Sequence, residues 1–188
     1  MHLPTLLVSL LPLTSAFLVP ANIPDGLYLA PINGTSASDL QRVDLDAIVA
    51  SHHIETARRS GRAADRRQER TKYSITRTGN RMFPNHGDYN ACTDSWRTFF
   101  ANGGVVKGHF LFLCTQGEAV LAGCNYRNND FRSQHTNPTL VDFFNGVADR
   151  YWGTWTTGYV KISYYEYSFI DFTFWRDLRG TQFCTDLP

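Results

Sequence analysis

The chain has 188 residues, and its 18 Lys and Arg residues nearly balance its 17 Asp and Glu residues, for a formal net charge of +1. This length suits one domain with appendages, and the near-zero charge provides no general field to attract nucleic acid or anionic lipid. A hydrophobic content of 43% with ordinary Gly and Pro numbers excludes the globally disordered and collagen-like classes.

The first element along the chain is an apolar N-terminal segment. Leu3–Leu13 has the length of a signal-peptide core, and the small residues Thr14-Ser15-Ala16 follow at the cleavage positions. A membrane anchor would need about 20 apolar residues, and prolines interrupt this run. We interpret residues 1–16 as a secretory signal peptide, cleaved after Ala16 or alternatively after Ala21, and expect a secreted, extracellular protein.

The next segment, residues 17–67, is predicted to be a pro-region. It has no cysteine and ends in a stretch with two arginine pairs, Arg58-Arg59 and Arg66-Arg67. Adjacent cationic side chains in an extended segment suit the acidic pockets of a kexin-type protease. We therefore expect such a protease to be a partner during secretion, with Arg67 as the last site; the alternative is a solvated basic linker.

Asn33-Gly34-Thr35 is an N-glycosylation sequon inside the predicted pro-region. Its position predicts a glycoprotein precursor whose glycan at Asn33 helps during secretion and is then discarded. The alternative is that the sequon is unused.

Residues 68–188 are predicted to be the mature, folded domain. They contain all but two of the aromatic residues and all four cysteines, Cys92, Cys114, Cys124 and Cys184. An even number of cysteines in a secreted chain predicts two disulfides, and their spacing does not resemble that of a zinc site. No metal or cofactor is expected.

The first half of this domain shows alternating and helical patterns in turn. Tyr73–Arg77 alternates and is rich in β-forming residues, whereas Asp88–Asn102 places Trp and Phe on one helical face. Val105–Cys114 and Glu118–Tyr126 then read as a hairpin with a turn at residues 115–117. In that register Cys114 lies opposite Ala119.

The pairing of the cysteines is partly constrained by this hairpin. Because strand side chains alternate between faces, Cys114 and Cys124 are expected on opposite faces and should not bond to each other. The other two possible connectivities remain open.

The second half repeats the order of a helix followed by a hairpin. Thr139–Tyr151 has apolar residues at helical spacing, and Tyr159–Tyr167 and Ile170–Trp175 alternate as antiparallel strands. The element order predicts an α+β fold, with two helices packed on an antiparallel β-sheet and stapled by disulfides, an α/β sandwich.

No catalytic signature is present, so the sequence favours a protein without enzymatic activity. The weak catalytic candidates for a small hydrolase or ribonuclease-like site are the polar side chains His109, Glu118 and Glu166, with Arg127 beside them. A second weak possibility is an acid–base pair formed by His86 and Asp88.

The aromatic run after the second helix suggests a third kind of site. Trp152 and Trp155 flank a glycine, and exposed indole rings could stack on sugars in a carbohydrate-binding module. The alternative is that the alternating aromatics fill the core and the edge of the sheet.

Several segments together give the chain a resemblance to small secreted fungal effectors, and within them to the killer toxin-like and necrosis-inducing extracellular group. The matching segments are Ile23–Ala30, Ala91–Trp96, Ala122–Tyr126, Tyr151–Gly158 and Phe183-Cys184. The resemblance implies a secreted virulence or toxin protein that acts on a host or a competitor, through a target that is a protein, a membrane or a glycan. The chain departs from many relatives in having no further cysteine near Trp152.

Overall fold

The computed structural model describes residues 16–34, 37–56, 72–76, 81–132, 138–165 and 168–185. Most of the predicted signal peptide and both arginine pairs, at 58–59 and 66–67, lie outside the described residues, as does Glu166. The predictions made for them stay predictions.

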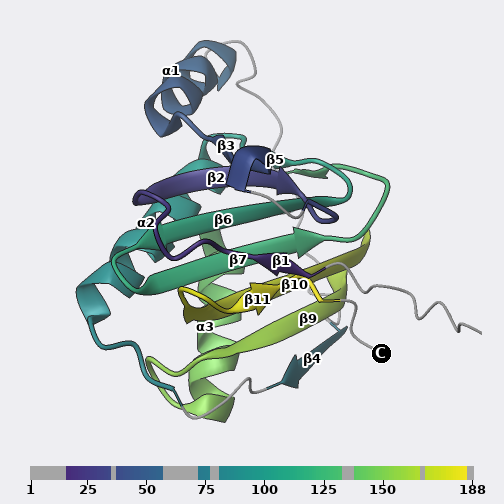
Figure 1. Cartoon of the computed structure of the whole chain (residues 1–188). Helices are drawn as coiled ribbons and strands as arrows, with labels where there is room; N and C mark the ends of the chain where they lie inside the picture. Colours follow the sequence, from purple (N-terminus) through teal and green to yellow (C-terminus); the bar gives the residue numbers. More distant parts are fainter. Residues whose placement is uncertain are drawn as a thin grey trace, which may run out of the picture.

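A seven-stranded antiparallel sheet forms the centre of the molecule, in the order β3-β2-β6-β7-β10-β9-β4. Its strands are β2 (Gly26–Pro31), β3 (Gln41–Arg42), β4 (Lys72–Thr76), β6 (Phe110–Gln116), β7 (Ala119–Asn125), β9 (Gly158–Tyr165) and β10 (Ser168–Leu178). Figure 1 shows the sheet face-on, with the short edge strands β3 and β4 at its two sides. The predicted α+β class, with helices on an antiparallel sheet, is confirmed.

Two helices cover one face of this sheet, which we call the helix face. They are α2 (His86–Ala101), which lies over β6 and β7, and α3 (Pro138–Trp152), which lies over β9. Both pass behind the sheet in Figure 1. Rings from α2, such as those of Trp96 and Phe99, pack on Phe112 of β6 at centroid distances of 4.9 and 4.1 Å. Each fully buried ring of this kind contributes roughly 1.5–3 kcal/mol to stability.

Short strands from the two ends of the described chain cover the opposite face, which we call the strand face. β1 (Phe17–Leu18) pairs with β11 (Gln182–Phe183) in a separate two-stranded sheet, drawn in front of the large sheet in Figure 1. The side chains of Phe17 and Phe183 are buried there against Leu111, Leu113 and Trp175. The sheet is therefore the middle layer of three.

The remaining elements are small. A two-stranded sheet pairs β5 (Val105–Val106) with β8 (Phe131–Arg132), a 3₁₀ turn η1 spans Ala37–Asp39, and helix α1 (Leu45–Thr56) packs beside α2. The predicted strand Val105–Cys114 is thus two strands, β5 and β6, separated by a turn.

The hairpin of β6 and β7 has a tighter register than the sequence predicted. Gln116 pairs with Ala119, so Cys114 lies opposite Leu121 and not opposite Ala119. The turn consists of Gly117 and Glu118, and Gly117 has a positive φ of 50°, a conformation that glycine adopts without steric cost. The shift is two residues, so each side chain keeps the face that the alternation predicted.

The disulfides follow from this alternation. Cys92 of α2 bonds to Cys114 on the helix face, and Cys124 bonds to Cys184 on the strand face. The prediction that Cys114 and Cys124 lie on opposite faces is confirmed. The structure also resolves the choice that the sequence left open.

The sheet extends beyond residues 68–188. Strands β2 and β3 come from the segment interpreted as a pro-region, and β2 lies inside the sheet, between β3 and β6. Sequence reasoning had given the segment 17–67 no part in the folded domain.

Candidate functional site

The weak catalytic candidates do not converge. His109 lies in the turn before β6, not within a strand as predicted, with a positive φ of 57°. Its ring is exposed, and Nε2 is 2.6 Å from Oδ1 of Asn128. Glu118 is exposed in the turn after β6. The seven residues of β6 separate the two side chains, a span of about 20 Å, so they share no site.

Arg127 contacts His109 through its backbone, since its carbonyl oxygen accepts a hydrogen bond from the amide of His109 at 3.0 Å. The structure therefore gives no support to an acid–base constellation of Arg127, His109 and a glutamate.

The aromatic candidate Trp155 lies in a different environment from the one expected for a sugar platform. Its ring is half-buried against the helix-face core, and the imidazole of His86 stacks on it at 4.2 Å between centroids and 10° between planes. Tyr89 meets the same indole edge-on, at 5.3 Å. The side chain of Trp152 lies outside the described residues.

Hydrogen bonds fix the loop that holds Trp155 in this position. The loop follows α3 through Gly153, whose φ is +90°, and Trp155 itself has a φ of +68°, an uncommon conformation for a residue with a Cβ atom. The amide of Phe83 donates to the carbonyl of Trp155 at 2.9 Å, and that of Thr157 donates to the carbonyl of Arg81 at 3.0 Å. The loop is thus tied to the segment that leads into α2.

The first turn of α2 presents His86. Asn85 caps the helix, accepting a hydrogen bond from the amide of Gly87 and donating one to a carboxylate oxygen of Asp88, both at 2.9 Å. The helix therefore begins two residues before the predicted Asp88. His86 and Asp88 make separate contacts, with Trp155 and Asn85, and do not form the suggested acid–base pair.

A buried cation lies behind these rings. Arg176 of β10 is fully buried, and its Nη1 donates to Asp149 at 2.7 Å and to the hydroxyl of Tyr89 at 3.3 Å. Its Nη2 donates to the carbonyl of Gly153 at 3.0 Å. The hydroxyl of Tyr89 in turn donates to Asn145 of α3. The guanidinium thereby joins α2, α3, β10 and the loop.

Burial raises the pKa of the Tyr89 hydroxyl, and the opposing effect of the neighbouring Arg176 guanidinium is smaller. Tyr89 therefore remains a neutral hydrogen-bond donor at physiological pH.

We call the group of His86, Tyr89, Trp155, Asp149 and Arg176 the His86–Trp155 site. It presents an exposed imidazole with an oriented ring plane, above a buried guanidinium whose carboxylate partner is 39% exposed. Such a surface can donate and accept hydrogen bonds and can bind a partner group at a fixed geometry.

Sequence reasoning missed the polar half of this site, although one signal pointed to it. On β10, Phe172, Phe174 and Arg176 share one face because side chains alternate. An arginine that continues an inward-facing row of phenylalanines predicts a buried, paired cation.

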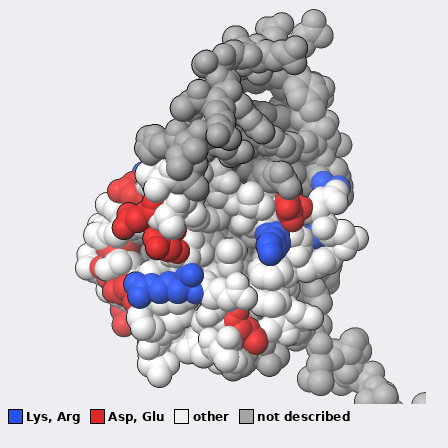
Figure 2. All heavy atoms as spheres, turned by 90° about the horizontal axis from the view of Figure 1, so that it is seen from above, with Lys and Arg blue, Asp and Glu red and all other residues white. Residues whose placement is uncertain are grey.

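A second candidate is a groove of about 500 Å³ between the N-terminal segment and α2. Its lining consists of Gly26, Leu27, Arg42, Val43, Asp44, Leu45, Asp46 and Ser95. Figure 2, which views the molecule from above, shows acidic side chains gathered on one part of the visible face with basic side chains beside them. The charges are mixed in sign, so the visible surface does not select a ligand by charge.

Within the part of the chain that the structure describes, no group of three or more His, Cys, Asp or Glu side chains is arranged to hold a metal ion. None of the helices described there combines the length and the apolar character needed to cross a bilayer.

Comparisons of the chain with models of known families, with curated proteins and with solved structures found no match. The resemblance to killer toxin-like effectors therefore stays a prediction.

Proposed function

We propose that this protein is a secreted fungal effector or toxin-like protein, matured by a kexin-type protease, that acts outside the producing cell on a host or a competitor by binding rather than by catalysis. The observation that carries the proposal is the pair of disulfides, one on each face of the sheet.

Disulfides persist in oxidising compartments and are rare where thiols are kept reduced. All four cysteines of the chain are paired, and both bonds tie distant segments to the same central hairpin. A protein built this way is suited to dilute, protease-containing extracellular fluid.

The predicted sequon is also accessible. Asn33 is exposed in the turn after β2, where a transferase could reach its side chain. This position supports the proposal of a secreted glycoprotein.

For the target-binding surface we propose the His86–Trp155 site. Residues held in uncommon backbone conformations gather at functional sites, where the surrounding structure enforces them, and Trp155 is such a residue. Because its loop is fixed by hydrogen bonds from the segment before α2, the exposed imidazole of His86 meets a partner with little loss of conformational entropy.

The experiment compares the purified protein with two histidine variants in assays of host-tissue necrosis and of competitor growth. His86→Ala removes the exposed ring of the site, whereas the control His109→Ala removes an exposed ring elsewhere, paired with Asn128. We expect the unaltered protein to be active, His86→Ala to lose at least about tenfold in potency, corresponding to about 1.4 kcal/mol of binding, and His109→Ala to remain active.

The alternatives give different outcomes. Activity lost in His109→Ala and retained in His86→Ala would favour the hydrolase hypothesis. Binding to a glycan array would favour the carbohydrate-binding hypothesis. An unaltered protein without effect on host tissue or competitors would contradict the proposal.

A further inference from the structure

We propose that cleavage at the arginine pairs does not release the N-terminal segment, and that the mature protein consists of two chains held together without a covalent bond. This inference rests on the cleavage included in the proposed function. The N-terminal chain is the piece between the signal peptide and the first cut, and its described part runs from Phe17 to Thr56. The C-terminal chain carries all four cysteines.

The first argument is the position of β2 in the sheet. All six of its residues pair with β6, from Gly26 opposite Thr115 to Pro31 opposite Phe110. Removing β2 would turn β6 into an exposed edge with unpaired backbone donors and acceptors, which costs free energy and favours aggregation.

The second argument is the apolar surface that the segment covers. Phe17 is 1% exposed, and Val19 and Ala30 are fully buried. They pack in one cluster with side chains of the C-terminal chain, among them Leu111, Leu113, Val120, Ala122, Tyr159 and Trp175. Losing the segment would bare this patch on the strand face, and folded proteins rarely leave a large contiguous apolar patch in water.

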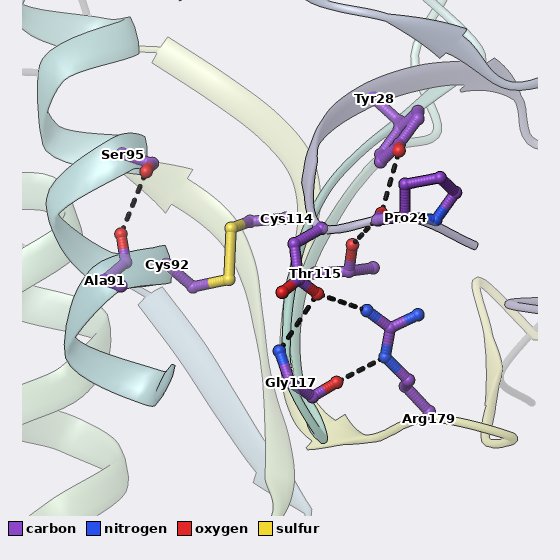
Figure 3. The surroundings of a disulfide bond; sticks show 10 residues. Pro24, Tyr28, Ala91, Cys92, Ser95, Cys114, Thr115, Gly117 and Arg179 are labelled. Atoms are coloured by element: carbon purple, nitrogen blue, oxygen red, sulfur yellow. Dashed lines mark hydrogen bonds and ion pairs between the residues drawn. A yellow bond between two sulfur atoms is a disulfide. The ribbon is translucent and has the colours of Figure 1, made fainter. Parts of the chain in front are cut away.

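The third argument is a polar connection in the stretch between β1 and β2. Arg179 donates to the carboxylate of Asp25 at 2.6 Å and to the carbonyl of Ile23. The same carboxylate accepts from the amide of Gly117 at 3.0 Å, and the carbonyl of Pro24 accepts from the hydroxyl of Thr115 at 3.0 Å. Figure 3 shows Arg179, Gly117 and Pro24 on the far side of β6 from the Cys92–Cys114 bond. The arginine side chain is only 9% exposed, whereas that of Asp25 is 45% exposed, so solvent screens this ion pair in part.

These three sets of contacts lie within residues 17–31, and each joins the segment to the C-terminal chain in a different way: through backbone pairing, apolar packing and polar bonds. Because residues 17–67 contain no cysteine, no disulfide can join the two chains. A pro-region that only assisted secretion would not need to complete the sheet and to cover its apolar face.

The experiment has two arms. In the first, the protein secreted by its producer is run on a size-exclusion column and then on a denaturing gel without reductant. We expect one native peak that resolves into two bands, with N-terminal sequences beginning near Phe17 and near Gln68. A single full-length band would contradict processing and leave the retention of the segment to the second arm.

In the second arm, Arg66-Arg67 is replaced by the recognition sequence of a site-specific protease, and the purified full chain is cut in the test tube. We expect both pieces to co-elute under native conditions and to separate in denaturant. Separate elution of the N-terminal piece under native conditions would overturn the inference, whether or not natural processing occurs.

A matched pair of variants sharpens the second arm. Phe17 and Leu18 are neighbours in β1, but Phe17 is buried whereas Leu18 is 52% exposed. After the cut, Phe17→Ala should weaken retention by at least about a hundredfold, as expected for truncating a buried aromatic, whereas Leu18→Ala should weaken it less than about tenfold. Equal effects of the two variants would contradict the role assigned to the strand face.

Discussion

The two faces of the sheet are built from different parts of the chain. The helix face is covered by α2 and α3, which follow or precede the strands they cover at short sequence distance. The strand face is covered by β1 and β11, and contacts there, such as that between Arg179 and Ile23, join residues 156 positions apart. One face thus depends on local chain segments, and the other on bringing the two ends together.

This difference affects the order in which the two faces form during folding. Contacts of high sequence separation carry a larger loop-closure cost before they stabilise the fold. The strand face is therefore expected to be completed last in folding and to open first.

The two disulfides provide the largest effect. Cys124–Cys184 closes a loop with a sequence separation of 60 on the strand face, and Cys92–Cys114 closes one of 22 on the helix face. From loop-closure entropy, loss of the longer loop should cost about 4 kcal/mol and loss of the shorter about 3 kcal/mol. The measurement is urea unfolding of the double variants Cys124→Ala/Cys184→Ala and Cys92→Ala/Cys114→Ala.

A larger loss of unfolding free energy in Cys92→Ala/Cys114→Ala than in Cys124→Ala/Cys184→Ala would contradict this prediction. It would show that the helix face depends more on its disulfide than the strand face does.

The packing on the helix face gives the next prediction. A Cβ atom on Gly123 of β7 would lie 2.4 Å from the ring of Phe172 and 2.6 Å from that of Trp96. Gly123→Ala should therefore destabilise the protein by about 2 kcal/mol, through overpacking, measured as a lower thermal midpoint.

The matched control is Gly146 of α3, where a Cβ atom would meet nothing within 4 Å. Gly146→Ala should stabilise the protein by about 1 kcal/mol, because alanine is the better helix former. A neutral Gly123→Ala would show that the two rings move aside easily.

Tyr89, the buried tyrosine of the helix face, predicts that the folded protein loses stability at alkaline pH. The pKa of Tyr89 is raised above its usual value of 10.0 by burial, so above pH 10 the unfolded chain loses this proton more readily than the folded one. The stabilising contribution is complete below pH 10 and is lost as pH rises further. Urea midpoints measured at pH 8–11 should fall less steeply in Tyr89→Phe; identical slopes would contradict the assignment.

The smallest effect is expected at the surface of the helix face. Arg97 of α2 forms ion pairs with Asp94 at 2.7 Å and with Asp142 of α3. Burial lowers the pKa of its guanidinium, but the hydrogen bonds and charges of the two carboxylates together raise it above its usual value. The Arg97 side chain is 40% exposed, so Arg97→Ala should cost less than about 1 kcal/mol, and added salt should reduce the difference. The control is Arg150→Ala, because the Arg150 side chain is exposed; this variant should be as stable as the unaltered protein.

The helices and the hairpin could be predicted because their signals are local. The aromatic residues of α2 recur at helical spacing. The side chains of β6 and β7 alternate between the two faces of the sheet, so the placement of Cys114 and Cys124 on opposite faces followed from counting residues along the hairpin. The predicted register was wrong by two residues, which is an even number, so the faces predicted for the two cysteines did not change.

The strand β2 could not be predicted in the same way. Its residues, Gly26–Pro31, form a short apolar run bounded by turn-forming residues, but nothing local identifies the strand with which they pair. Their partner strand is β6, whose paired residues lie 79–89 positions further along the chain. The stacking of His86 on Trp155 was missed for the same reason, since it depends on a loop that only the tertiary fold places.

The disulfide arrangement also determines which cuts of the backbone leave the two fragments covalently linked. A protease cut at the exposed Asn128 falls inside the loop closed by Cys124 and Cys184, so both fragments stay linked. A cut between Gly117 and Glu118 falls between the two closed loops and leaves no disulfide across the break. Residues 115–123, whose hairpin turn is bound by Asp25 of the N-terminal segment, are therefore the only covalent link between the two disulfide-closed loops.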